Sequence, residues 1–227
     1  MRERRRIGRV CVITDVTVQS RFGHVELAEL ACSGGADLIQ LRDKALADDA
    51  LIRVARAVRR VCDRHGALLL VNDSVLVARE AGAHGVHLGL DDTPIEEARR
   101  VLGDGAVIGA TAHSLEEAIA ADRTSADYLG FGHIFPTASK QKSTPPVGID
   151  GLARVCAAVS IPVLAIGGIT SAHVSDVMRA GAWGVAVIAE VCTADDPRAA
   201  TERLRSAINE STGSSEFSRH NVHPNRA

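Results

Sequence analysis

Short apolar runs recur along the chain, and amphipathic stretches of helical period separate them. The runs are apolar on both faces, which is typical of strands buried in a parallel sheet rather than of surface hairpins. This pattern predicts eight strands: Val10–Thr14, Leu38–Leu41, Leu68–Val71, Gly85–Leu88, Val107–Ala110, Tyr128–Phe131, Val163–Ile166 and Gly184–Ile188.

The stretches between these runs begin and end with helix signals. Thr93 and Ser114 each precede a helical pattern with Glu three positions later, a capping box, and Pro94 stands where a first helical residue is expected. Small-residue turns such as 180–182 end helices and lead into the next strand. Eight alternating strands and helices predict an α/β fold, a single (β/α)8 TIM barrel, with an open doubly wound sheet as the alternative.

Composition agrees with one large core. The chain has 227 residues, of which 46% are hydrophobic, and a mean hydropathy of +0.07. The net charge of -2 gives no global attraction to nucleic acid or to a membrane surface, and no apolar run approaches the roughly 20 residues of a membrane span. The five cysteines form no CxxC pair, so we interpret them as small core residues of a reduced, cytoplasmic protein.

The two ends of the chain differ from the middle. Residues 1–9 are rich in arginine with no long apolar segment after them, so we expect a flexible basic N-terminus. Residues 10–208 contain the barrel pattern, and we expect residues 209–227 to be a disordered polar tail. The sequence leaves the oligomeric state open, a homo-oligomer included.

Polar residues follow the strands, where a barrel carries its active site. After the second strand, Gln40, Arg42 and Lys44 alternate, so their side chains point the same way in an extended strand end. Arginine and lysine on one face would bind phosphate oxygens. The alternative is a surface ion pair between Arg42 and Asp43.

Two carboxylates follow the next two strands. Asp73, after Asn72, and Asp92 come from neighbouring strand ends and could share one Mg²⁺ ion with substrate oxygens and water. The alternative is that Asp73 caps the helix beginning near Ser74 and that Asp92 or Thr93 caps the following one.

The last strands suggest a second phosphate site. Gly167-Gly168 and Ile188-Ala189 follow strands seven and eight, whose loops form the standard barrel phosphate site. A long loop after strand six, residues 132–148, contains Thr137, Ser139 and Lys140. We expect this loop to close over substrate, whereas the alternative is an ordinary insertion. Two phosphate sites predict an enzyme that joins two phosphorylated small molecules.

Six short strings occur in order between Val10 and Ile208: Ile13-Thr14-Asp15, Gln40-Leu41-Arg42-Asp43-Lys44, Val71-Asn72-Asp73, Gly85-Val86-His87-Leu88-Gly89, Phe135-Pro136-Thr137-Ala138-Ser139-Lys140 and Ala165-Ile166-Gly167-Gly168-Ile169. Together they resemble the thiamine phosphate synthase family. The resemblance implies condensation of hydroxymethylpyrimidine pyrophosphate with the phosphate of hydroxyethyl-methylthiazole, through ionisation of the pyrimidine–oxygen bond and release of pyrophosphate.

The resemblance also implies roles for individual residues. The aminopyrimidine would be held by Gln40 and His87. The departing pyrophosphate would be held by Arg42, Lys44, Asn72 and Lys140, and Thr111 stands at a catalytic serine position of the family. The Mg²⁺ ion would be held by Asp73 and Asp92, and the thiazole phosphate by Thr137, Ser139, Gly168, Ile188 and Ala189.

Several residues depart from the family pattern. Leu90 replaces a glutamine, His133 a proline and Ala189 a serine. The stretches 111–117 and 130–133 also resemble a sister branch, the thiazole tautomerase, in which His113 or His133 would move a proton on the ring. The complete pyrophosphate and Mg²⁺ residues favour the synthase. A third hypothesis, a non-catalytic barrel that binds thiamine-related phosphates, fits poorly with an intact carboxylate pair.

Overall fold

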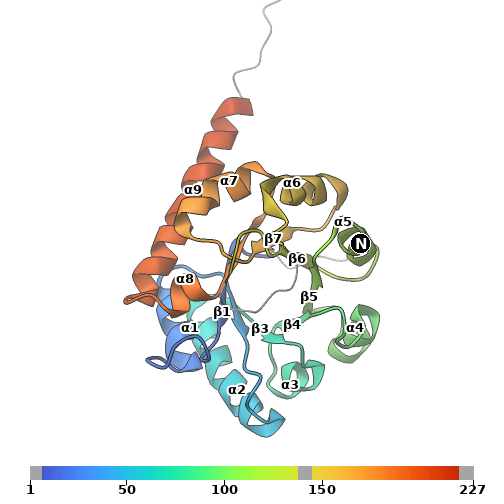
Figure 1. Cartoon of the computed structure of the whole chain (residues 1–227). Helices are drawn as coiled ribbons and strands as arrows, with labels where there is room; N and C mark the ends of the chain where they lie inside the picture. The colour runs from blue at the N-terminus through green and yellow to red at the C-terminus, as the bar shows by residue number, and fades with distance from the viewer. Residues whose placement is uncertain (1–6, 138–144, 220–227) are drawn as a thin grey trace, which may run out of the picture.

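Eight parallel strands close into a barrel in the computed structural model, which describes residues 7–137 and 145–219 and, for residues 213–219, the backbone alone. Each strand pairs with its sequence neighbours, and the eighth pairs with the first. The strands lie at the centre of the molecule, with helices around them (Figure 1). The strands are β1 (Val10–Thr14), β2 (Leu38–Leu41), β3 (Leu68–Asn72), β4 (Gly85–Leu88), β5 (Val107–Ala112), β6 (Tyr128–Gly132), β7 (Val163–Ile166) and β8 (Gly184–Val187). The predicted TIM barrel is confirmed, and the open sheet is excluded.

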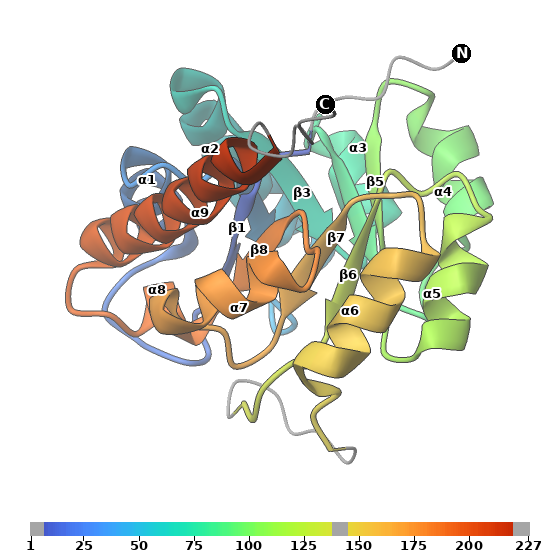
Figure 2. The ribbon, with the colours of Figure 1, turned by 90° about the horizontal axis from the view of Figure 1, so that it is seen from above.

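Helices surround the strands on the outside of the barrel (Figure 2). They are α1 (His24–Ser33), α2 (Asp48–His65), α3 (Val75–Glu80), α4 (Ile95–Leu102), α5 (Leu115–Asp122), α6 (Gly148–Ala158), the 3-10 turn η1 (Ser171–His173), α7 (Val174–Arg179), α8 (Ala189–Cys192) and α9 (Pro197–Arg219). No helix in the described ranges is long and apolar enough to cross a membrane.

Strand ends account for the small differences from prediction. β3, β5 and β6 run one or two residues further than the apolar pattern indicated, because parallel pairing continues through Asn72↔His87, Ala112↔Phe131 and Gly132↔Ile166. β8 ends at Val187, one residue earlier than expected. Backbone pairing between strands therefore continues past the apolar run, to positions where the side chains are polar or small.

The helix starts agree in part with the capping signals. The Ser114 hydroxyl accepts the backbone N–H of Glu117 at 3.2 Å, which confirms the predicted N-cap of α5. The prediction for α4 is wrong by one residue: the helix begins at Ile95, and Pro94 rather than Thr93 occupies the N-cap position.

Strand alternation divides the core into two layers. Inward residues such as Cys11 and Ile13 fill the barrel, whereas outward residues such as Val10 and Val12 pack under the helices. Four of the five cysteines are buried and the fifth, Cys156, is half-buried; all are free thiols. Their predicted role as core residues is confirmed.

The last helix, α9, lies beside α1, α7 and α8 (Figures 1 and 2). Ala200, Leu204 and Ile208 are fully buried at helical spacing and attach it to the barrel. The backbone remains helical to Arg219, so the boundary that we expected at Asn209 falls inside this helix.

Candidate active site

A cavity of about 500 Å³ opens at the carboxyl ends of the strands. Most residues predicted for the site line it: Gln40, Lys44, Asn72, Asp73, His87, Asp92, Thr111, Thr137, Gly168, Ile188 and Ala189. Ser139 and Lys140 lie outside the described residues. The lining side chains come from separate strands, so closure of the barrel is what brings them together.

The two predicted metal ligands lie next to each other. Burial raises the pKa of Asp73 above its ordinary value, and hydrogen bonding and repulsion from Asp92 add to this, while Lys44 opposes it. The Lys44 ammonium lies 3.4 Å from the Asp73 carboxylate. Asp73 also has a φ of 65°, a left-handed backbone that is uncommon for a residue other than glycine and recurs at functional sites.

The capping alternative for these carboxylates is wrong. Ser74 caps α3, since its hydroxyl accepts the backbone N–H of Val77 at 3.2 Å. The Asp92 carboxylate accepts the N–H of Gly89 at 2.7 Å, within its own loop. One oxygen of Asp92 is therefore used to shape the loop, and both carboxylates remain available to the cavity.

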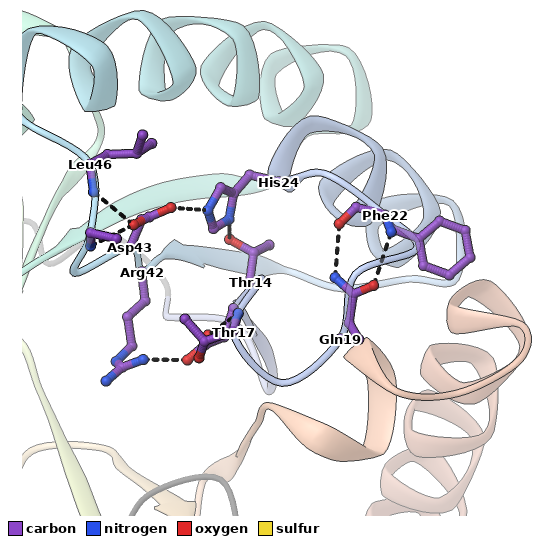
Figure 3. A network of polar contacts seen from close by, with 10 residues as sticks. Thr14, Thr17, Gln19, Phe22, His24, Arg42, Asp43 and Leu46 are labelled. Carbon is purple, nitrogen blue, oxygen red and sulfur yellow. Dashed lines mark hydrogen bonds and ion pairs between the residues drawn. The ribbon is translucent and has the colours of Figure 1, made fainter.

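Arg42 lies beside the cavity but is not one of its lining residues. Its guanidinium pairs with Asp15, which is only 1% exposed, and its Nε is buried without a hydrogen-bond partner among the described atoms (Figure 3). Thr17 donates both its backbone N–H and its hydroxyl to Asp15. In this structure the arginine is thus neutralised by a carboxylate that the sequence analysis did not assign to it.

A second buried pair supports the same corner. His24 Nε2 lies 3.0 Å from Asp43, and His24 Nδ1 lies 2.9 Å from the Thr14 hydroxyl (Figure 3). Burial raises the pKa of Asp43, but hydrogen bonds to its carboxylate outweigh burial and hold the pKa below its ordinary value. The donors are His24 and the backbone N–H groups of Ala45 and Leu46. The alternative of a surface pair between Arg42 and Asp43 is therefore wrong.

A chain of hydrogen bonds forms the floor of the cavity. His87 Nδ1 lies 2.8 Å from the Tyr128 hydroxyl, and His87 Nε2 lies 2.9 Å from the Thr111 hydroxyl. Both ring nitrogens of His87 thus have protein partners.

The double glycine after β7 allows two loops to approach closely. A Cβ on Gly168, whose φ is 66°, would lie 2.4 Å from the carbonyl oxygen of Pro136. The N–H of Phe135 donates to the Gly167 carbonyl at 3.0 Å. These glycines therefore hold the start of the long loop against β7, in addition to lining the cavity.

The histidines considered for proton transfer also reach the site. His113 and His133 both line the cavity, and His133 is 7% exposed. The backbone N–H of His113 donates to Glu117 at 2.6 Å, which anchors the loop after β5.

Comparison with known proteins identifies the family of the chain. A family model described as thiamine monophosphate synthase matches residues 10–191. The chain belongs to the thiamine monophosphate synthase family. It is 48% identical to a thiamine-phosphate synthase of Salinibacter ruber, over 91% of each chain, and 46% identical to one of Chlorobium limicola, over 86% of this chain and 91% of the relative.

A solved structure, thiamine phosphate pyrophosphorylase from Pyrococcus furiosus, superposes with a TM-score of 0.82 at 38% identity. It covers 89% of this chain and 96% of the other. Enzymes of the thiamine monophosphate synthase family are transferases, and the family generally uses Mg²⁺.

Sequence reasoning missed three residues of this candidate site. Tyr128 and Glu190 line the cavity, and Asp15 pairs with Arg42. Two of the three could have been identified from the sequence. Tyr128 is the only tyrosine of the chain and begins a predicted strand, and Asp15 directly follows a predicted strand. Glu190 is near the end of the last strand, but no pattern distinguishes it from a surface glutamate.

Proposed function

We propose that this chain condenses hydroxymethylpyrimidine pyrophosphate with the phosphate ester of hydroxyethyl-methylthiazole, forming thiamine phosphate and pyrophosphate. The observation that carries the proposal is the acidic pair Asp73 and Asp92 beside Lys44, at the mouth of a barrel that matches the synthase family along almost its whole length. A pyrophosphate leaving group needs this combination of a metal site and a cation.

The charge of the cavity supports a metal requirement. Its described lining residues include one lysine, Lys44, and four carboxylates: Asp73, Asp91, Asp92 and Glu190. Such a lining would repel a pyrophosphate unless a cation intervened. Oxygen donors are what Mg²⁺ prefers. Burial is the main cause of the raised pKa of Asp73, and the repulsion from Asp92 that adds to it would be relieved by a shared ion. We therefore assign Asp73 and Asp92 as the residues that hold Mg²⁺.

The cavity divides into two subsites. Gln40, His87 and Thr111 come from β2, β4 and β5, and we assign them to the pyrimidine. Gly168, Ile188 and Ala189 follow β7 and β8, and we assign their backbone to the thiazole phosphate, with Thr137 beside them. The subsites lie on different sides of one cavity, as a bond between two bound molecules requires.

The residues then have simple tasks. Lys44, Asn72 and Lys140 bind the departing pyrophosphate. Ser139, like Thr137, binds the thiazole phosphate. Bound Mg²⁺ would supply electrostatic stabilisation of charge that develops on the leaving group. Little general acid–base work is needed, because the thiazole nitrogen attacks a pyrimidine carbocation and gives up no proton. We assign the reaction to the cytoplasm, in keeping with the free, mostly buried cysteines.

The proposal is tested by pyrophosphate release from purified protein given both substrates and Mg²⁺, with each component omitted in turn. We expect release only when all three are present. Release without the thiazole phosphate would indicate a hydrolase, and no release from the complete mixture would refute the synthase.

The metal assignment is tested with two substitutions at one position. Asp92→Ala removes both the charge and the acceptor for the Gly89 N–H, whereas Asp92→Asn keeps an oxygen for that N–H and removes only the charge. We expect both variants to fold, and both to need far more Mg²⁺ for turnover. Wild-type Mg²⁺ dependence in Asp92→Asn would refute the assignment.

A second candidate is the thiazole tautomerase, which His113 and His133 favour because both line the cavity. The discriminating result is interconversion of the thiazole carboxylate phosphate isomers without pyrimidine or Mg²⁺. If that reaction occurred and condensation did not, catalytic weight would move to these histidines.

A further inference from the structure

One residue between the two cations after β2 has no task in the proposed function. Asp43 stands between Arg42 and Lys44 in the sequence, but the described ion pairs of these cations are with Asp15 and Asp73. The Asp43 side chain is only 5% exposed, so its carboxylate needs other partners inside the protein.

The partner of Asp43 is His24, the first residue of α1, whose side chain is also only 5% exposed. His24 Nε2 lies 3.0 Å from Asp43 Oδ2, and His24 Nδ1 lies 2.9 Å from the hydroxyl of Thr14, at the end of β1 (Figure 3). The pKa of Asp43 lies below its ordinary value, so the carboxyl group is ionised at neutral pH. An ionised carboxylate only accepts hydrogen bonds, so Nε2–H of His24 is the donor.

His24 therefore links three segments of the chain. It begins α1, it contacts β1 through Thr14, and it contacts the turn after β2 through Asp43. An apolar side chain of similar size would fill the same space and make neither contact. The histidine thus supplies bonds between these segments as well as volume.

The second oxygen of Asp43 shapes the turn that carries Lys44. Asp43 Oδ1 accepts the backbone N–H of Ala45 at 2.8 Å and that of Leu46 at 3.0 Å. Lys44 lies inside this turn, so the turn determines where its backbone lies. The Lys44 side chain is flexible and 63% exposed, and its described contact is the one at 3.4 Å with Asp73. The position of the ammonium therefore depends strongly on the turn.

We propose that His24 is a positioning residue for Lys44. By holding Asp43 against β1 and α1, it fixes the turn after β2, and the turn places the Lys44 ammonium beside Asp73. It also keeps the Asp43 carboxylate from turning toward Lys44, so the charge of the lysine remains available to a pyrophosphate. The inference rests on the proposed function for its ligand, and on the described hydrogen bonds for its geometry.

Two substitutions of His24 separate its two contacts. The amide nitrogen of glutamine reaches the place of Nε2, so His24→Gln keeps a donor for Asp43. The amide of asparagine reaches only the place of Nδ1, so His24→Asn keeps a partner for Thr14 and releases Asp43. Calorimetry would measure the dissociation constant of inorganic pyrophosphate with Mg²⁺, and that of the thiazole phosphate as an internal reference.

We expect His24→Asn to weaken pyrophosphate binding by roughly tenfold, because a binding group displaced by about 1 Å loses much of its effect. Affinity for the thiazole phosphate should stay within about twofold of wild type, since its assigned subsite is made by other strands. His24→Gln should restore most of the affinity for pyrophosphate. Wild-type affinity in His24→Asn, or equal losses in both variants, would overturn the proposal.

The route through Lys44 is tested in a double variant. Lys44→Ala should weaken pyrophosphate binding by itself. If His24 acts through Lys44, adding His24→Asn to Lys44→Ala should reduce affinity by less than about twofold more. The same loss with and without the lysine would show that the two residues act independently, and would also overturn the proposal.

His84→Asn is the matched control. The His84 side chain is 12% exposed, and its Nδ1 accepts the backbone N–H of Leu69 at 2.9 Å. It directly precedes β4, at the end of the barrel away from the cavity. The variant should lose thermal stability and keep its affinity for pyrophosphate. A loss of affinity as large as that of His24→Asn would show a general effect of destabilisation and count against the positioning role.

Thr14→Val gives a milder test in case His24→Asn does not fold. It removes one hydroxyl and keeps the histidine, so His24 would lose its contact with β1 alone. We expect pyrophosphate binding to weaken by about two- to threefold, as the loss of one modest hydrogen bond would produce. Unchanged affinity would mean that the link to β1 does not hold the turn.

These outcomes are separate from those of the proposed function. If the wild-type protein bound pyrophosphate and responded to His24→Asn but catalysed no condensation, the reaction would be refuted and the role of His24 would stand. If it catalysed condensation and His24→Asn bound pyrophosphate normally, the synthase would stand and the role of His24 would be refuted.

Discussion

The pair between Asp15 and Arg42 offers a direct test of how the corner between β1 and β2 is held together. Asp15→Asn removes the negative charge and keeps the shape, including an oxygen that can still accept from Thr17. The guanidinium of Arg42 is then left without its counter-charge in a site where its own side chain is only 12% exposed.

The magnitude follows from burial. Removing one partner of a buried pair destabilises a protein by about 3–5 kcal/mol, because the remaining charge is left uncompensated. Partial exposure of Arg42 admits some solvent screening, so we expect the lower end, about 3 kcal/mol. For a chain of this size each kcal/mol lowers Tm by about 2–4 °C, so the expected fall is about 6–12 °C.

Thermal and urea unfolding of wild type and variant would measure this effect. Asp176→Asn is the control, since Asp176 pairs with Arg179 at 2.8 Å in a bridge that is more than half exposed on both sides. Such a surface pair contributes about 0–1 kcal/mol, so its loss should change Tm little.

A fall in stability no larger for Asp15→Asn than for Asp176→Asn would refute the reasoning. The double variant Asp15→Asn with Arg42→Met provides a second check. Because it removes both charges, it should be less destabilised than the sum of the single variants, and strict additivity would mean that the two side chains do not interact.

Three further predictions follow from single contacts. The folded-state pKa of Asp43 is lowered, so its contribution to stability is present above the unfolded pKa of about 3.9 and is lost as the pH falls through the folded pKa. Tm of the wild type should therefore fall more steeply below about pH 4 than Tm of Asp43→Asn. Parallel curves of Tm against pH would contradict this. Gly109→Ala should destabilise the protein by about 1–3 kcal/mol in urea unfolding, because the new methyl overlaps the Tyr128 ring; a neutral result would mean that the ring has room to move. Ser114→Ala should cost about 1 kcal/mol through loss of the α5 cap, measured the same way, whereas Ser114→Asn should restore most of the stability.

The sequence was sufficient for the barrel because its signals are periodic. Runs such as Leu38–Leu41 are apolar on both faces, and only a sheet covered on both sides buries them, so strand number and strand position followed directly. The same logic located the cavity, because polar residues such as Asp73 and Asp92 stand directly after strands whose carboxyl ends meet at one mouth.

Pairings between side chains did not follow from the pattern. Arg42 was expected to face phosphate or to pair with its neighbour Asp43, and it pairs with Asp15 instead. The partner of Arg42 depends on the loop after β1. In that loop Gln19 hydrogen-bonds to the backbone of Phe22 and closes a turn that the hydrophobic pattern does not predict (Figure 3). Likewise the inward position of Tyr128 follows from strand alternation, but its partners depend on which strands become neighbours across the barrel.

The electrostatics of the cavity connect these observations to the reaction. Asp15 neutralises Arg42, so the cationic side chain among the described lining residues is that of Lys44. Lys44 in turn forms an ion pair with Asp73. A pyrophosphate in such a site would need further positive charge, from a bound cation or from a cationic side chain of a neighbouring loop. On the proposed assignment, Mg²⁺ on the acidic pair would be one source, and Lys140 would be another. Affinity for the pyrimidine substrate should therefore depend more steeply on Mg²⁺ than affinity for the thiazole phosphate, whose assigned subsite is backbone rather than carboxylate.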